Sequence, residues 1–438
     1  MSVRTHSRLV GAVAVSVALV AGGCTGGTGG DTRSPDAVAS DAPPTTEATG
    51  PAPTPPEVAR VSAPRRGGSL LLHGKYPRQT SRCVDHEQPT FDARYPGTLF
   101  VRRAGDGSLT LMLALPFESY LSGIAEVPPS WPREALKAQA IAARSYALAT
   151  TGWSGEEGDE LDTAICSTAA CQVYRGIPVP FEPSVRRWWR AVRQTRGQVI
   201  VYDERPAETL YFSTSNGRTY GNEDVFGSAP LPYLRPIEEH DDGASPTSRW
   251  RVTLPFEDLA TFLELAGEWP GGRIRSVRLR GAEVIVAGPG TSRTIGARTF
   301  RDAVNAWAPC LEPDRYPPLS PNGTRLPVSV PSMWVEISRT RGGVVLDGRG
   351  WGHGVGMVQW GAYGKARRGL SAEEILAFYF GGFGPQPFPE PGLIHVRVAS
   401  GLTSLRIRPS EPGARINGEE VGRGTILVTG GDTLTIRS

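Results

Sequence analysis

One carboxyl group, Glu126, stands where it could carry out acid–base chemistry. Its immediate neighbours are apolar, and Pro128 and Pro129 restrict the backbone directly after it. A carboxyl group in an apolar, rigid setting has a raised pKa, which a general acid needs near neutral pH. The same residues also suit a carboxylate that caps the following helix or pairs with an arginine. Taken alone, they favour this structural interpretation.

A helix is expected directly after this loop, from Pro132 onward. Proline in the first turn and Glu134 close behind it are typical of a helix start. Its many alanines make the helix thin, so another backbone can approach closely. Lys137 and Arg144 are seven residues apart and share a face, where they could bind a sugar acetamido group or a lactyl carboxylate. The alternative is an exposed face with two ordinary cations.

A second chemically suggestive segment, GWGHGVG at 350–356, is rich in glycine. It lacks the Lys-Ser/Thr ending of a phosphate loop, so its glycines are expected to let the backbone run close beside a substrate or another strand. His353 lies among them and could contact sugar or bind a metal, although a lone histidine is more often a structural hydrogen bonder. Trp351, Trp360 and Tyr363 could stack on sugar rings or belong to the core.

The five cysteines indicate an oxidising compartment. If Cys24 carries lipid, four remain, and we expect Cys166 to pair with its close neighbour Cys171 and Cys83 to pair with Cys310. Four cysteines allow three pairings, so the connectivity stays an inference. Zinc between Cys166 and Cys171 is disfavoured, because the sequence CSTAAC offers no third ligand between them. No cofactor is expected.

Residues 1–24 have the pattern of an export signal, with a basic start, an apolar run and the sequence AGGC. This pattern predicts a lipoprotein signal with lipidation at Cys24, and an ordinary cleaved signal peptide is the alternative. Residues 25–66 are rich in Gly, Thr and Pro and are expected to form a disordered linker. The protein is therefore expected at the outer face of the membrane or in the cell wall, or secreted. A net charge of +3 gives no reason to expect a nucleic acid partner.

The remaining chain predicts an α+β fold: a mixed, β-rich catalytic domain with a few helices and small β segments on both sides. The N-terminal β segment is expected at 67–114, the catalytic domain at 115–384 and the C-terminal β segment at 385–438. Residues 235–335 are a candidate insertion. Periodicity and capping signals predict helices at 184–196, 256–266, 296–307 and 371–379, the last with Ser371 as its N-cap.

Taken together, these segments resemble the SpoIID/LytB family, whose members are stage II sporulation protein D-like. The resemblance rests on four blocks in order: LPFESYLSGIAEVPPSWPREALKAQAIAARSYAL at 115–148, CSTAACQVYRG at 166–176, YFSTSNGRTYGNEDVFG at 211–227, and GRGWGHGVGMVQWGAYGKA through ILAFYFGG at 348–382.

The resemblance implies activity on peptidoglycan. Some family members are lytic transglycosylases in which the glutamate of an AEMP-like block is catalytic, and Glu126 occupies that place with Val127 where methionine is usual. Some members bind zinc through a histidine between the two cysteines, but Ala170 stands here beside Cys171. Other members enhance an amidase, so a non-catalytic peptidoglycan-binding modifier is the alternative. A hydrolase that uses water is a third possibility.

A transglycosylase of this kind needs one carboxyl group. Glu126 would protonate the oxygen linking N-acetylmuramic acid to N-acetylglucosamine and take the proton of the muramoyl C6 hydroxyl, which gives a 1,6-anhydro end. The expected partners are glycan strands and, for the modifier, a cell-wall amidase. The expected substrate-binding residues come from three of the four blocks: Lys137, Arg144, Ser213, Ser215, Asn216, His353 and Gln359.

Overall fold

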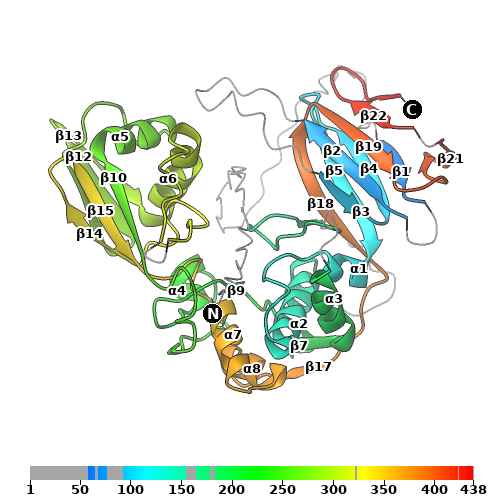
Figure 1. Cartoon of the computed structure of the whole chain (residues 1–438), viewed down its shortest axis with the longest axis horizontal. Coiled ribbons are helices and arrows are strands. Elements are labelled where there is room, and N and C mark those ends of the chain that lie inside the picture. The colour runs from blue at the N-terminus through cyan, green and yellow to red at the C-terminus, as the bar shows by residue number, and fades with distance from the viewer. Residues whose placement is uncertain are drawn as a thin grey trace, which may run out of the picture.

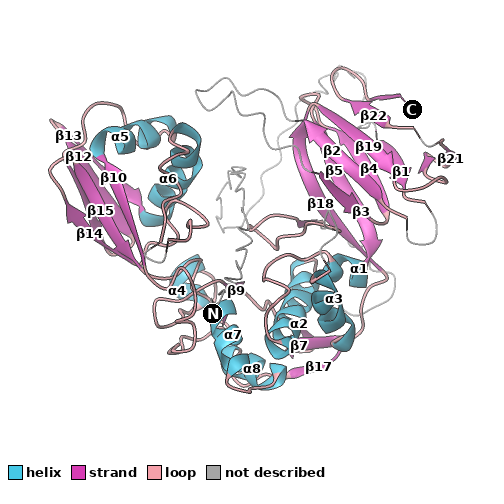
Figure 2. Cartoon of the chain, viewed as in Figure 1, coloured by secondary structure: helices cyan, strands magenta, loops and turns pink. Residues whose placement is uncertain are grey.

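The computed structural model describes residues 58–64, 68–75, 92–153, 164–177, 183–320, 323–422 and 424–437. A β domain, a central group of helices and a smaller α+β lobe make up this part of the chain (Figure 1). Figure 2 shows the strands concentrated at the two sides and most helices between them. The predicted α+β class is confirmed.

Two antiparallel-rich sheets build the β domain. The first contains seven strands in the order β21-β20-β1-β4-β5-β18-β6, and the second contains five in the order β23-β22-β19-β2-β3. Their bounds are β1 Val58–Ser62, β2 Leu70–Lys75, β3 Asp92–Tyr95, β4 Thr98–Arg103, β5 Leu109–Pro116, β6 Ile165–Cys166, β18 Leu393–Leu402, β19 Ser404–Pro409, β20 Arg415–Ile416, β21 Glu419–Glu420, β22 Ile426–Thr429 and β23 Thr435–Arg437.

The two predicted terminal β segments, 67–114 and 385–438, are one domain. β18 from the C-terminal end pairs with β5 from the N-terminal end, and β19 pairs with β2. Alternating residues of these strands, such as Leu109, Leu111 and Leu113 of β5, are fully buried between the sheets. Neither segment could bury such a face alone, which explains why they fold together.

The predicted linker, 25–66, is too long at its C-terminal end. β1 lies within it and pairs with β4 over its full length. Its sequence VARVS alternates exposed and buried residues, and this short period-2 signal was missed beside the proline-rich run. Residues 1–57, with the predicted signal, Cys24 and most of the linker, lie outside the described residues, as does Cys83.

The central part is organised around helix α2, Arg133–Thr150, which is buried on most sides. Its small alanines let neighbouring elements approach closely, as expected. Helices and short strands surround it: α1 Phe117–Ser122, α3 Val185–Gln194, β7 Gln198–Tyr202, β8 Arg205–Pro206, β9 Tyr211–Phe212, α4 Asn222–Phe226, β16 Met357–Val358, α7 Gln359–Arg367, α8 Ala372–Tyr379 and β17 Pro385–Pro387.

Helix α8 has the predicted N-cap, because the Ser371 side chain accepts a hydrogen bond from the Glu374 N–H. Helix α7 was not predicted, since Gly361 and Gly364 make its sequence look like a loop. These glycines are needed for packing: a side chain at Gly361 would overlap Tyr379, and one at Gly364 would overlap the Asp241 carbonyl.

The smaller lobe has its own core and overlaps the candidate insertion, 235–335, but its elements begin at Trp250 and end at Gly348. Strand β15, which precedes the glycine-rich segment, pairs here with β10 on one side and with β14 on the other. Its elements are β10 Trp250–Pro255, α5 Phe256–Leu265, β11 Ser276–Arg280, β12 Glu283–Gly288, β13 Thr291–Gly296, α6 Ala297–Leu311, β14 Val335–Arg339 and β15 Gly343–Gly348.

No helix among the described residues is long and apolar enough to cross a membrane.

Candidate active site

Glu126 lies on a loop that pairs with a second loop from a distant part of the chain. The Ala125 N–H donates to the Val173 carbonyl at 2.9 Å, and the Val173 N–H donates to Glu126 Oε1 at 2.6 Å. An isolated bridge between Ile124 and Tyr174 continues this pairing. Main-chain bonds on both sides therefore fix the position of the Glu126 carboxyl group.

A disulfide closes the loop that precedes Val173. Cys166 and Cys171 are joined with their Cα atoms 5.5 Å apart, as predicted. Cys166 ends β6, which pairs in parallel with β18 of the β domain. The disulfide thus connects the loop that holds Glu126 to the large sheet. Cys310 is also disulfide-bonded, whereas its predicted pairing with Cys83 remains a prediction.

Burial raises the pKa of the half-buried Glu126 carboxyl above its usual value. The Val173 N–H donates to it and opposes this rise in pKa, and the neighbouring Gln359 and Tyr211 side chains and the positive charge of Arg175 act in the same direction. None of these groups is a second carboxylate. Desolvation prevails over these opposing groups, so the site favours a carboxyl group that can hold a proton closer to neutral pH.

Tyrosines surround this carboxyl group. The Tyr211 hydroxyl donates to Gln172 Oε1 at 2.7 Å, and Gln172 Nε2 donates to the Tyr120 hydroxyl at 3.1 Å and to the Ala143 carbonyl at 3.2 Å. Burial raises the pKa of Tyr120 and Tyr211 well above the usual value, so both are protonated at neutral pH. They can donate or accept hydrogen bonds beside Glu126 without adding charge.

Tyr211 and Gln172 were missed as site residues. Both lie within the segments recognised as motif blocks, at the start of YFSTSNGRTY and directly after Cys171. Tyr211 begins strand β9, and Gln172 lies in the loop after the disulfide. No spacing rule relates them to Glu126, because the chain separates them from it by tens of residues.

The glycine-rich segment, 350–356, packs against the strand that carries Tyr211. Its backbone pairs with the segment around β9: the Trp351 N–H donates to the Thr214 carbonyl at 2.8 Å, and the Met357 N–H donates to the Leu210 carbonyl at 2.9 Å. Gly356 has a φ of 79°, and a side chain there would overlap the Leu210 carbonyl. The expected close approach is therefore to a strand of the protein itself.

His353 is fixed by two hydrogen bonds to main-chain atoms. Its Nε2 lies 2.9 Å from the Tyr211 carbonyl, and its Nδ1 accepts from the Val355 N–H at 3.1 Å. The ring also packs between Phe212 and Phe226. Burial lowers its pKa to about 4, so it is neutral at pH 7. This is the structural alternative weighed above: His353 positions Tyr211, with no nitrogen left for sugar or metal.

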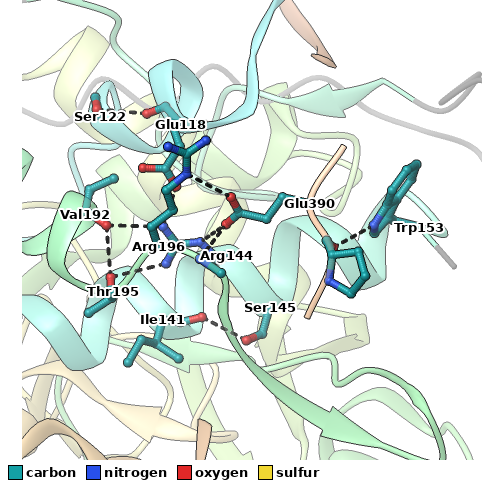
Figure 3. A network of polar contacts seen from close by, with 12 residues as sticks. Glu118, Ser122, Ile141, Arg144, Ser145, Trp153, Val192, Thr195, Arg196 and Glu390 are labelled. Carbon is teal, nitrogen blue, oxygen red and sulfur yellow. Dashed lines mark hydrogen bonds and ion pairs between the residues drawn. The ribbon is translucent and has the colours of Figure 1, made fainter. Parts of the chain in front are cut away.

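Arg144 lies inside the protein, with no exposed side-chain surface. Its guanidinium donates to Glu118 at 2.6 Å, to Glu390 at 2.5 Å, to Thr195 Oγ1 at 3.2 Å and to the Val192 carbonyl at 3.3 Å (Figure 3). These bonds use four of its five N–H donors, and the side chain is fully buried, so Arg144 is not placed to contact a substrate. Sequence spacing gave its face on the helix but not the acidic partners, which come from α1 and from the segment before β18.

Lys137 stays partly exposed and is bound to Glu134 at 2.9 Å. Among the block residues at 213–216, Ser213 and Asn216 are partly exposed, whereas Ser215 is buried. The Ser215 hydroxyl donates to Asp242 at 2.7 Å, so it serves a structural contact. Asn216 donates to the Tyr220 hydroxyl at 2.8 Å.

Two of the three predicted stacking residues form one aromatic cluster near the site. Trp360 and Tyr363 of α7 both contact Trp131, which follows the Glu126 loop, with ring centroids 4.9 and 5.2 Å from it. Trp360 and Tyr363 are partly exposed. Trp351, also partly exposed, lies in the backbone pairing with Thr214 instead.

The family resemblance raised zinc, and the donor set does not fit it. The sulfurs of Cys166 and Cys171 are bonded to each other, and both nitrogens of His353 are engaged. In the described ranges, no three His, Cys, Asp or Glu side chains are grouped to hold a metal ion.

The fold and the site together define an α+β protein built around one partly buried carboxyl group. The family model described as Stage II sporulation protein (SpoIID) matches residues 105–202. An uncharacterised protein of Brachyspira hyodysenteriae is 31% identical over 294 residues, which span 66% of this chain and 71% of that relative. This chain belongs to the SpoIID/LytB family.

Two relatives from Bacillus subtilis carry descriptive names. Stage II sporulation protein D is 27% identical over 277 residues, covering 61% of this chain and 74% of the relative. The amidase enhancer is 30% identical over 290 residues, covering 59% of this chain but only 38% of the relative.

Proposed function

We propose that this protein is a peptidoglycan lytic transglycosylase that cleaves the bond between N-acetylmuramic acid and N-acetylglucosamine. The observation that carries the proposal is the setting of Glu126: a single carboxyl group, fixed by the Val173 N–H, whose pKa is raised by burial. The coarser conclusion, a role on peptidoglycan, agrees with membership of the SpoIID/LytB family.

The reaction needs one group that first gives and then takes a proton. Protonated Glu126 donates its proton to the glycosidic oxygen as the bond from that oxygen to C1 of the muramoyl sugar breaks. The resulting carboxylate takes the proton of the C6 hydroxyl, whose oxygen bonds to C1. The products are a free hydroxyl on N-acetylglucosamine and a 1,6-anhydro muramoyl end, and Glu126 is protonated again.

A single carboxyl group suits an internal nucleophile. Glycosidases that use water or a covalent intermediate commonly pair two carboxyl groups across the scissile bond. The groups that most affect the pKa of Glu126 are a main-chain N–H, an amide, an arginine and a tyrosine. In glycosidases with two carboxyl groups, the second one activates water or is itself the nucleophile. In this protein, the C6 hydroxyl of the substrate would be the nucleophile.

The partly exposed polar residues near the motif blocks are the proposed sugar contacts. Lys137, Ser213 and Asn216 retain exposed surface, and the aromatic pair Trp360 and Tyr363 offers a surface for stacking. Gln359 and His353 act on the site rather than on the sugar, through Glu126 and Tyr211 respectively.

A second function is favoured by one comparison. Because a relative named amidase enhancer is 30% identical, the chain could instead bind peptidoglycan and stimulate an amidase without cleaving glycan. Under either function, we propose that the protein works outside the cytosol, either secreted or anchored through a lipidated Cys24.

Product analysis in ¹⁸O-labelled water separates the candidates. Purified protein is incubated with glycan strands, with and without stem peptides, and the products are weighed by mass spectrometry. A transglycosylase gives anhydro ends without ¹⁸O, and a hydrolase gives reducing ends that contain ¹⁸O. Intact strands that remain bound to the protein would support the modifier and contradict the transglycosylase.

A further inference from the structure

A fully buried amide lies directly beside the main-chain donor that holds Glu126. Gln172 has no exposed surface, and the next residue is Val173, whose N–H bonds to Glu126 Oε1 at 2.6 Å. The peptide unit that carries this N–H is the one between Gln172 and Val173. Because a buried amide needs partners at both of its ends, the contacts of Gln172 show what fixes this peptide unit.

The Gln172 side chain is bonded to three different elements. Its Nε2 donates to the Tyr120 hydroxyl of α1 at 3.1 Å and to the Ala143 carbonyl of α2 at 3.2 Å. Its Oε1 accepts from the Tyr211 hydroxyl of β9 at 2.7 Å. These bonds use both hydrogens of the amide nitrogen, so both ends of the side chain are engaged inside the protein.

The orientation of the Gln172 amide follows from the Ala143 carbonyl. A carbonyl oxygen can only accept, so the amide nitrogen must lie on that side, since the reversed amide would bring two oxygens together. The amide oxygen therefore faces Tyr211, whose hydroxyl must donate to it. Contacts to three elements thus give the Gln172 side chain one position and one orientation.

The backbone that follows this side chain is tied to the loop that carries Glu126. The Ala125 N–H donates to the Val173 carbonyl at 2.9 Å, so the two loops run side by side at this point. The Val173 N–H bonds to the Glu126 carboxyl group and not to a carbonyl of that loop. The position of Gln172 is therefore passed to the carboxyl group through one peptide unit.

A main-chain donor on one carboxyl oxygen separates the roles of the two oxygens. Glu126 Oε1 accepts from the Val173 N–H, and an oxygen without a proton is the better acceptor. When the carboxyl group is protonated, its proton is therefore favoured on Oε2. A carboxyl group without this donor has no such preference between its two oxygens.

We propose that Gln172 is a positioning residue that holds the peptide unit before Val173 in place, so that its N–H stays on Glu126 Oε1 and Oε2 is the oxygen that exchanges the proton. Gln172 does not touch a substrate, because it has no exposed surface. It acts through Val173 and fixes the carboxyl group relative to α1, α2 and β9. Proton exchange with a glycan rests on the proposed function, whereas the position of the carboxyl group does not.

The other groups that face Glu126 keep their charge while it titrates. Tyr120 of α1, Tyr146 of α2 and Tyr211 of β9 have pKa values that burial raises, so all three stay neutral. Arg175 stays positively charged and is exposed to solvent, which screens its charge. A pH-dependent change at the Val173 N–H therefore reports the ionisation of Glu126.

The resonance of the Val173 amide proton tests the proposal directly. In ²H,¹⁵N-labelled wild type it should move downfield as Glu126 ionises, because a carboxylate accepts a stronger hydrogen bond than a carboxyl group. Glu126→Gln should abolish this titration, which assigns it. In Gln172→Met the amplitude should fall at least about twofold, and the midpoint should rise by about half a unit, because the carboxylate loses a donor.

Thr209→Val is the matched control. Thr209 has no exposed surface, and its hydroxyl donates to the Ala142 carbonyl at 2.8 Å, next to the carbonyl that Gln172 uses. The change removes one buried hydrogen bond to the same turn of α2 and keeps the shape of the side chain. It should lower stability without changing the amplitude or the midpoint of the Val173 titration.

An unchanged amplitude and midpoint in Gln172→Met, or equal changes in Thr209→Val, would overturn the proposal. If Gln172→Met does not fold, Gln172→Asn replaces it, because its shorter amide cannot reach all three partners. The titration needs no substrate, so the predicted changes in a protein that cleaves no glycan would refute the proposed function and leave this inference standing. Glycan cleavage by a wild type whose Val173 amide does not titrate would overturn this inference alone.

Discussion

Glu126 is held by a main-chain donor, and it forms no ion pair with a cation of the described residues. A carboxylate in a close salt bridge has a lowered pKa and makes a poor proton donor at neutral pH. The positive charge that lowers the Glu126 pKa belongs to Arg175, which is exposed, and the opposite effect of burial prevails. The Glu126 carboxyl group can therefore both donate and accept a proton. Glu118 and Glu390, which form ion pairs with Arg144, have a structural role that needs no proton exchange.

His353 should make stability depend on pH. Its pKa is about 4 in the folded protein and near 6.5 when unfolded, so the unfolded chain binds the extra proton between these values. Its contribution is complete above pH 6.5 and is lost as the pH falls toward 4, by up to about 3 kcal/mol. Urea unfolding at several pH values measures this loss.

The matched variant for this prediction is His353→Gln, which cannot titrate. It should be less stable at pH 7 but show a flatter decline between pH 6.5 and 4. Equal slopes in the two proteins would show that the pKa of His353 is not lowered in the folded protein.

For individual residues, the sequence predicted Glu126 as the candidate acid but did not predict the residues that contact it. The apolar neighbours and the prolines around Glu126 are local signals, and the disulfide between Cys166 and Cys171 also follows from short spacing. Val173, Tyr211 and Gln359 reach Glu126 only through the tertiary fold. All three lie in the blocks that carry the resemblance, but only Gln359 was given a role, and that role was substrate binding.

Helix α2 is joined to its neighbours through Arg144. This one guanidinium bonds to Glu118 of α1, to the C-terminal end of α3 and to Glu390, which leads into β18 (Figure 3). Glu390 in turn accepts from the Gly197 N–H at 3.1 Å. The central helices and the β domain are therefore connected by one buried ionic cluster.

Arg144→Met should destabilise the protein by about 3 kcal/mol, because Glu118 loses its buried cation and Glu390 keeps only the exposed Arg196, 3.9 Å away. Denaturant unfolding measures the loss. Replacing both acids by glutamine in the same variant should recover part of it, since no unpaired charge then remains. A variant that keeps full stability but loses glycan binding would instead make Arg144 a substrate residue.

Element types were largely predictable where signals are local. The helices α3, α5, α6 and α8 lie where periodicity and capping placed them. Helix α7 was not foreseen, because its glycines serve a packing contact with Tyr379 and Asp241 that no local rule encodes. Arg144 shows the same limit, since its acidic partners lie on separate elements.

The whole molecule depends on strands from both ends of the chain. β18 lies between β5 and β6 in the large sheet, and β19 lies between β2 and β22 in the small one. The sequence predicted strands at both ends but treated them as separate segments. The apolar alternation within each strand can be recognised locally. Which distant strand it pairs with cannot, because no local pattern encodes that choice.

A chain that stops at residue 384 should fail to fold. It loses β18 and β19, so the buried leucines of β5 and β2 have nothing to cover them. We expect aggregation or a loss of cooperative unfolding, measured by size exclusion and thermal denaturation. A soluble, cooperatively unfolding product would contradict the assignment of both ends to one domain.

Deletion of the smaller lobe is the control for the truncation at residue 384. Trp250 and Gly348 are paired neighbours at its base, so a short Gly-Ser link can replace the chain between them. The lobe has a separate core, and the remaining protein should keep its cooperative transition.

The central claim is that Glu126 alone provides the acid and base of a glycan-cleaving transglycosylase. The most direct measurement counts 1,6-anhydro muramoyl ends released from purified glycan strands by the wild type, by Glu126→Gln and by Glu134→Gln, whose carboxylate instead pairs with Lys137. We predict anhydro ends from the wild type and Glu134→Gln, and a loss of at least about a hundredfold in rate for Glu126→Gln. Anhydro ends released equally by Glu126→Gln would contradict the account.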